Sequence, residues 1–119
     1  MILKFTVSMK KNHEFRRLYA KGKSVAASSL VVYFKPTGRH YSQLGITVST
    51  KVGNAVCRNS VRRKIREIYR LNEPRLRPGL DIVVVARNKA AFSDYHRLER
   101  DFLYCCGKLG IIAEGAKEK

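Results

Sequence analysis

The sequence predicts an α+β domain, a small mixed sheet with packed helices in the order α-β-β-β-α-β-α. Three observations support this class: three segments carry apolar residues at helical spacing, the segments between them are rich in β-branched residues, and Gly, Pro and Asn mark the junctions. The chain has 119 residues, 45% of them hydrophobic, which suits one domain with its own core. We assign residues 1–113 to this domain and expect the charged tail at residues 114–119 to be disordered.

The first half of the chain predicts one helix followed by strands. Residues 12–21 place apolar side chains on one helical face, with Asn12 as the cap and Gly22 at the end. Residues 24–34 and 44–50 are predicted to be strands that pair antiparallel with each other, because a Pro-Thr-Gly turn separates them. The third strand of this group has no assigned range.

The second half predicts two helices on either side of a buried strand. A helix capped by Asn54 runs to about residue 71. The continuous apolar run at residues 82–86 is typical of a strand that is covered on both faces. Ser93 is the expected cap of a last helix, which ends near Gly110.

Positive charge is the unusual feature of the composition. The chain has 25 Lys and Arg against 9 Asp and Glu, a net charge of +16 at pH 7. Residues 1–23 and residues 51–70 each hold seven cations and one acid, and such clustering is typical of proteins that bind a polyanion. No apolar run can span a bilayer, no signal peptide is visible, and three cysteines without CxxC spacing favour a reducing, cytoplasmic location.

The second predicted helix separates apolar from basic residues. At roughly 100° per residue, one arc contains the apolar side chains from Cys57 to Tyr69, and an adjoining arc centred on Asn59 contains arginines. Guanidinium groups suit bidentate contact with phosphates. A solvated face is the alternative, but such a face normally alternates in sign, so we favour binding. The candidate RNA-binding residues are Lys51, Asn54, Arg58, Asn59, Arg62, Arg63, Arg66 and Arg70.

Aromatic residues accompany the first basic segment. Phe15, Tyr19 and Tyr33, with Lys11 and Lys35, form a candidate cleft for single-stranded RNA, in which each stacked base contributes about 1–3 kcal/mol. Spacing alone favours a core position for Phe15 and leaves packing and binding evenly balanced for the two tyrosines. Their hydroxyl groups and the neighbouring lysines favour partial exposure.

No pattern in the sequence indicates chemistry by the polypeptide. The acids are dispersed, no glycine-rich phosphate loop precedes a helix, and the three histidines show no metal-ligand spacing. Cys57 faces the apolar arc and has no histidine near it in sequence, which favours a buried thiol over a nucleophile. We therefore predict no catalytic residue and no metal ligand.

Residues 51–66 closely resemble the signature helix of the bacterial ribonuclease P protein family, with the sequence KVGNAVCRNSVRRKIR. Residues 11–33 and 81–87 are also similar to that family, and the resemblance covers roughly residues 8–109. It implies a cytoplasmic ribonucleoprotein that removes the 5′ leader of precursor tRNA, in which the RNA subunit performs the Mg²⁺-dependent hydrolysis and holds most of the Mg²⁺. It also implies a two-layer α-β sandwich with a left-handed β-α-β crossover, opposite to the usual hand.

By position, the resemblance places the arginines of the second helix against the RNA subunit, and Phe15, Tyr19 and Tyr33 in the cleft for the leader. Ser60 stands where the family usually has Arg, and Ser8-Met9 replaces the common Arg-Leu; at Ser60 we expect the loss of a flanking charge and not of the site. The implied partners are the ribonuclease P RNA subunit and precursor tRNA, with no membrane and no obligate protein partner. The alternatives are a structural RNA-binding protein of ribosomal type and a stand-alone nuclease.

Overall fold

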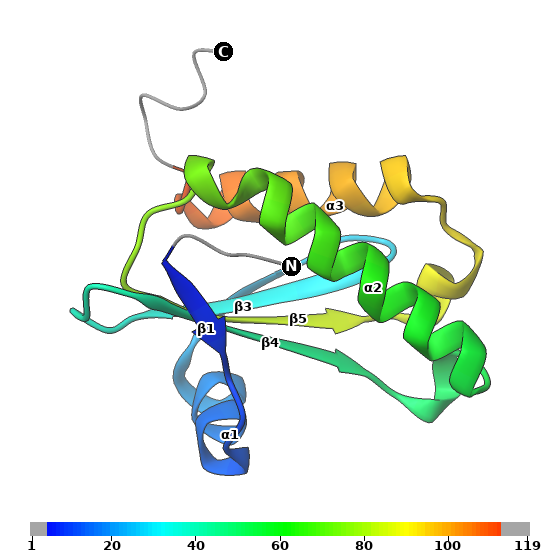
Figure 1. Ribbon diagram of the computed structural model, residues 1–119, viewed down its shortest axis with the longest axis horizontal. Helices are drawn as coiled ribbons and strands as arrows, with labels where there is room; N and C mark the ends of the chain where they lie inside the picture. The colour runs from blue at the N-terminus through cyan, green and yellow to red at the C-terminus, as the bar shows by residue number, and fades with distance from the viewer. Residues whose placement is uncertain (1–4, 113–119) are drawn as a thin grey trace.

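A computed structural model describes residues 5–112 and confirms the α+β class (Figure 1). Within these residues the helices are α1 (Asn12–Lys21), α2 (Ala55–Asn72) and α3 (Tyr95–Leu109). The strands are β1 (Thr6–Ser8), β2 (Lys23–Ala26), β3 (Leu30–Pro36), β4 (Ser42–Val48) and β5 (Leu80–Ala86). The short 3-10 turns are η1 (Thr50–Val52), η2 (Glu73–Arg75) and η3 (Asn88–Phe92). The predicted order is present, with the short strand β1 added ahead of it; the tail at residues 114–119 lies outside the described residues.

The strands form one five-stranded mixed sheet with the order β1-β4-β5-β3-β2. β4 is parallel to both β1 and β5, whereas β3 is antiparallel to β5 and β2. Two predictions are therefore wrong. Residues 24–34 are two strands, because the chain turns between Ala26 and Leu30, and β4 does not pair with β3, because the apolar strand β5 lies between them.

The central position of β5 explains its composition. α2 and α3 cover one face of the sheet and α1 lies on the other, as Figure 1 shows. Ile82 and Val84 belong to the large core under α2 and α3, and Val83 belongs to a smaller cluster with Met9 and Leu18 on the α1 side. The prediction of a strand covered on both faces is confirmed. The hand of the β4-α2-β5 crossover stays a prediction.

Helix caps agree with the sequence at one of three positions. Asn54 caps α2 as predicted, because its Oδ1 atom accepts a hydrogen bond from the Cys57 amide at 2.9 Å. The cap of α3 is Asp94 and not Ser93, whose hydroxyl donates to the Lys89 carbonyl instead. α1 covers the predicted residues 12–21, but the cap position is occupied by Lys11 and not Asn12, and no side chain caps this helix.

A buried carboxylate attaches β1 to the end of α2. One oxygen of Glu73 accepts hydrogen bonds from the Phe5 amide at 2.9 Å and from the Thr6 hydroxyl at 2.6 Å. The Thr6 hydroxyl also bonds to the phenol of Tyr69 at 2.8 Å. These bonds fix the short strand β1 beside β4, where it forms one wall of the candidate site described below.

Candidate nucleic-acid interface

The structure confirms the two faces of α2. Val61, Ile65 and Ile68 are buried against the sheet, while Arg63 and Arg66 are exposed and Arg62 is half-buried. The only ion pairs among residues 5–112 are Arg39–Asp81 and Arg70–Glu67, so no carboxylate neutralises the three arginines in the middle of the helix. The Arg62 guanidinium donates to Asn59 Oδ1 at 2.9 Å, which orients it without removing its charge. This part of α2 is a positive surface open to an anionic partner.

The other candidate RNA-binding residues differ in exposure and in whether their polar groups already bond within the protein. Arg70 forms a two-point ion pair with Glu67, with its Nε atom 3.0 Å from Oε1 and its Nη2 atom on Oε2. The hydrogen bond from Arg70 lowers the pKa of Glu67, so the acid remains ionised and offsets this arginine. Arg58 is half-buried, and Asn54 uses its side-chain oxygen as the helix cap. Lys51 is exposed on η1.

The aromatic residues of the predicted cleft lie on the α1 face of the sheet. Tyr19 of α1 is 41% exposed, and its ring meets Tyr33 of β3 edge-on with 5.0 Å between centroids. The Tyr19 hydroxyl also bonds to Thr47 Oγ1 on β4 at 3.0 Å. Tyr19 is therefore partly exposed, as its hydroxyl indicated, and its side chain connects α1 to two strands of the sheet.

Phe15 combines the core position that its spacing predicts with the cleft position that the family resemblance implies. Its ring packs at the border of the Met9–Leu18–Val83 cluster, as expected of a core residue. The same ring remains half-buried and lines two surface pockets. Gly45 of β4 makes this possible, because a Cβ atom there would lie 2.5 Å from the Phe15 ring.

The two pockets meet at Phe15 and join the predicted sites. The first, about 240 Å³, brings Arg62 and Arg66 of α2 to the Phe15 ring, between β1 and β4. The second, about 380 Å³, is lined by Phe15, Tyr19 and Thr47 together with two residues absent from our prediction, Asn12 and Arg16. We call the two pockets together the leader cleft, after the ligand that the sequence resemblance predicts for this region. Three predicted cleft residues, Lys11, Tyr33 and Lys35, do not line either pocket. Tyr33 is half-buried and reaches the cleft only through its ring contact with Tyr19.

The lining of the leader cleft offers phosphate and base contacts and no acid–base pair. Among residues 5–112, no group of three His, Cys, Asp or Glu side chains is placed to hold a metal ion. Cys57 is half-buried, with its Sγ atom 3.9 Å from the Val52 carbonyl. None of the described helices combines the length and apolarity needed to cross a bilayer.

An α+β domain with an arginine-rich helix beside an aromatic groove defines a protein of the RNA-binding class. A family model described as Ribonuclease P matches residues 3–110. The chain therefore belongs to the ribonuclease P protein family, and it is the protein component of this tRNA-processing endoribonuclease.

Individual relatives agree with this assignment. The chain is 40% identical over 106 residues to the ribonuclease P protein component of Natranaerobius thermophilus, covering 89% of this chain and 92% of that protein. It is 47% identical over 93 residues to the component from Clostridioides difficile, covering 75% and 82%. The Staphylococcus aureus RNase P protein structure superimposes with a TM-score of 0.81 at 34% identity, covering 88% and 96%. The Thermotoga maritima protein gives 0.74 at 34% identity, covering 82% and 92%.

Proposed function

We propose that this chain binds the ribonuclease P RNA subunit through α2 and the single-stranded 5′ leader of precursor tRNA through the leader cleft, in the cytoplasm. In this proposal the RNA subunit performs the Mg²⁺-dependent cleavage, and the protein raises the affinity for the correct substrate. The observation that carries the proposal is the position of Phe15, whose ring lies in both pockets and so joins Arg62 and Arg66 to Tyr19.

In the leader cleft, one group of residues is suited to the phosphates of an unpaired strand and another group to its bases. Arg62, Arg66 and Arg16 supply charge for backbone phosphates. The rings of Phe15 and Tyr19 supply faces for bases, each worth about 1–3 kcal/mol when stacked. Stacking is tolerant of sequence because every base has a flat face, so the cleft is suited to leaders of varied sequence.

The donor set of the leader cleft is consistent with Mg²⁺ held by the RNA. Mg²⁺ prefers carboxylate and phosphate oxygens. The two pockets are lined by apolar, hydroxyl, amide and guanidinium groups without a carboxylate. The chain is thus expected to assist metal binding by fixing the leader and its phosphates, and not as a ligand.

The test of the α2 surface is the triple variant Arg62→Ala, Arg63→Ala and Arg66→Ala, measured for affinity to the RNA subunit over a salt series. Each lost phosphate contact flattens the slope of log affinity against log salt by about 0.7–0.9, so three give about 2–2.7. The matched control removes three exposed cations outside α2: Arg77, Arg100 and Lys108. Equal slopes for the wild type and the α2 variant would contradict the assignment.

The test of the leader cleft is Tyr33→Ala in the holoenzyme, with precursor and mature tRNA compared, because this variant removes the ring that supports Tyr19 of the cleft from β3. We expect the preference for precursor tRNA to fall while the affinity for mature tRNA is unchanged. Tyr33 also contacts the smaller core cluster, so the unfolding free energy of the variant is measured alongside. An equal loss for both tRNAs would indicate packing only, and a wild-type protein without preference for the precursor would favour the structural RNA-binding alternative.

A further inference from the structure

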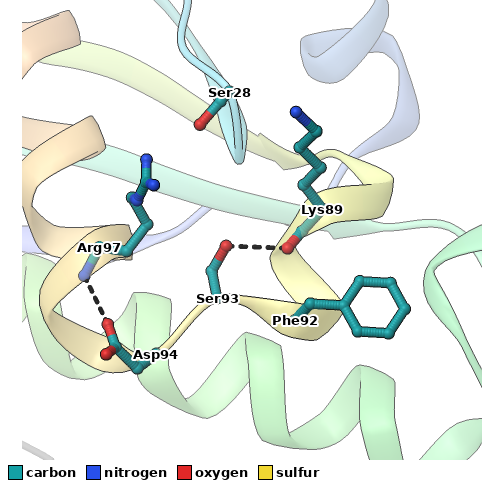
Figure 2. Close-up of a pocket in the computed structure, with 6 residues that line it drawn as sticks. All are labelled: Ser28, Lys89, Phe92, Ser93, Asp94 and Arg97. Atoms are coloured by element: carbon teal, nitrogen blue, oxygen red, sulfur yellow. Dashed lines mark hydrogen bonds between the residues drawn. The ribbon is translucent and has the colours of Figure 1, made fainter.

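Apart from the two pockets of the leader cleft, another surface pocket with an exposed aromatic ring lies at the end of the sheet, away from α1. It has a volume of about 570 Å³ and is lined by Ser28, Lys89, Phe92, Ser93, Asp94 and Arg97 (Figure 2). We call it the η3 pocket, because η3 and the start of α3 form most of it. Its volume is in the range of sites that hold a small ligand or a nucleotide.

The side chains of the η3 pocket combine the two chemistries that bind an unpaired nucleotide. Phe92 is 91% exposed, the most exposed large apolar side chain among residues 5–112. Figure 2 shows its ring projecting away from the ribbon, while Lys89 and Arg97 extend on either side of Ser93 toward Ser28. Neither cation has an ion-pair partner among the described residues. A lone exposed ring is ordinary, but a ring beside two cations without ion-pair partners suits a base and its phosphate.

The η3 pocket is held in place by hydrogen bonds from three elements. The Asp101 carboxylate of α3 accepts from the Ser29 amide at 3.1 Å and from the Ser28 hydroxyl at 3.3 Å, which fixes the β2–β3 turn. The Ser93 hydroxyl donates to the Lys89 carbonyl at 2.8 Å, and Asp94 accepts from the Arg97 amide at 2.9 Å. The acid of the lining is therefore engaged as a helix cap, and the two cations project from a fixed frame.

The strand register leads from the leader cleft to the η3 pocket. Thr47, which lines the cleft, is paired with Val85 of β5. Two residues further on, about 7 Å of extended chain, Arg87 lines a pocket of about 370 Å³ that shares Ser28 and Lys89 with the η3 pocket. A strand of RNA that leaves the cleft past Thr47 and Val85 thus meets positive charge at the end of the sheet.

We propose that the η3 pocket binds a nucleotide of the 5′ leader further from the cleavage site than the nucleotides in the leader cleft. Phe92 stacks on the base, and Lys89 and Arg97 contact the flanking phosphates. This assignment rests on the proposed function, since it extends the path of the same strand.

The experiment compares precursor tRNAs with a short leader that ends within the cleft and with a longer leader, bound to the reconstituted holoenzyme. Phe92→Leu keeps an apolar side chain and removes the flat ring, and we expect about a tenfold weaker affinity for the long leader only. Lys89→Ala with Arg97→Ala is expected to flatten the salt slope for the long leader by about 1.4, from about 0.7 per lost single-strand contact. The matched control, Arg100→Ala with Lys108→Ala, removes two exposed cations of α3 outside the pocket.

Three outcomes would overturn the assignment to the leader. Unchanged long-leader affinity in both η3 variants would show a solvated surface. Equal losses of affinity for short-leader, long-leader and mature tRNA would assign the pocket to the RNA subunit. Binding of a protein that depends on Phe92, with no change in RNA affinity, would assign the pocket to a protein partner. Failure of the proposed function is a separate result, because the wild-type holoenzyme would then show no difference between precursor and mature tRNA.

Discussion

Gly45 of β4 is the position at which one added carbon tests the geometry of the leader cleft most directly. A Cβ atom at Gly45 would lie 2.5 Å from Phe15 Cε1 and 2.6 Å from Cζ, whereas ordinary contacts are 3.4–4 Å. The Phe15 ring must therefore move by about 1 Å in Gly45→Ala. Since Gly45 lies in a regular strand without a positive φ, an alanine adds no backbone strain and the effect is steric.

The expected loss of unfolding free energy in Gly45→Ala depends on the packing around the Phe15 ring. Overpacking a core costs about 1–3 kcal/mol, and the half-buried ring has pocket space on its outer side, so we expect about 1 kcal/mol less unfolding free energy. The displaced ring enters the pockets that it lines, so the affinity for precursor tRNA falls more than the affinity for mature tRNA. Denaturant titration measures the first quantity and equilibrium binding to the holoenzyme measures the second.

Gly107→Ala is the matched control, because apart from its chain neighbours and the backbone of its own helix no atom lies within 4 Å of a Cβ at this exposed position of α3. Alanine in place of glycine inside a helix is expected to raise the unfolding free energy by about 0.5–1 kcal/mol and to leave RNA binding unchanged. A double-mutant cycle with Phe15→Leu isolates the contact, since the smaller side chain relieves the clash. The reasoning is refuted if Gly45→Ala has the same effect with Leu at position 15, or if precursor preference survives it unchanged.

Two further predictions concern buried groups. Burial raises the pKa of Cys105 to about 11 and that of Cys106 further, so both thiols stay protonated at pH 8 and should resist alkylation until the protein unfolds. Alkylation of the native protein is followed by mass spectrometry, and rapid labelling of either thiol would contradict this prediction. Glu73→Ala removes the acceptor of the Phe5 and Thr6 bonds and should lower the unfolding free energy by about 1–3 kcal/mol, with a smaller loss for Glu73→Gln, as measured in denaturant. Equal losses for the two variants would mean that the hydrogen bonds to β1 do not stabilise the fold.

The local features of α2 were accessible from the sequence because they depend on residues close together in the chain. The helical period fixes which side of α2 is apolar, and Asn54 caps it through an atom three residues away. The pairing of Arg70 with Glu67 is equally local, at a separation of three residues, but we did not predict it and placed Arg70 among the RNA-binding residues. It reduces the set of free arginines that the sequence predicted.

The pairing of the strands could not be predicted from the sequence in this way. The residue pattern of a strand indicates which of its faces is buried, but not which strand lies beside it. The turn after Pro36 suggested a hairpin between neighbours in sequence. The buried strand β5 instead occupies the centre, since it is the strand with apolar side chains on both faces, and it separates β3 from β4. β1 was missed because three residues carry too little periodicity to be read.

The shortness of β1 explains why the arginines of α2 and the ring of Phe15, predicted as parts of two separate sites, line one pocket. β1 pairs with Ser42, Gln43 and Leu44, so within the described residues the outer edge of β4 has no partner strand from Gly45 to Val48. Arginines of α2 come from one face of the sheet and Phe15 from the other, and both line a pocket at this open edge. A longer β1 would separate the two faces with a wall of backbone. The fold thus brings the arginine-rich segment and the aromatic segment together by ending a strand early, a relation between residues far apart in sequence.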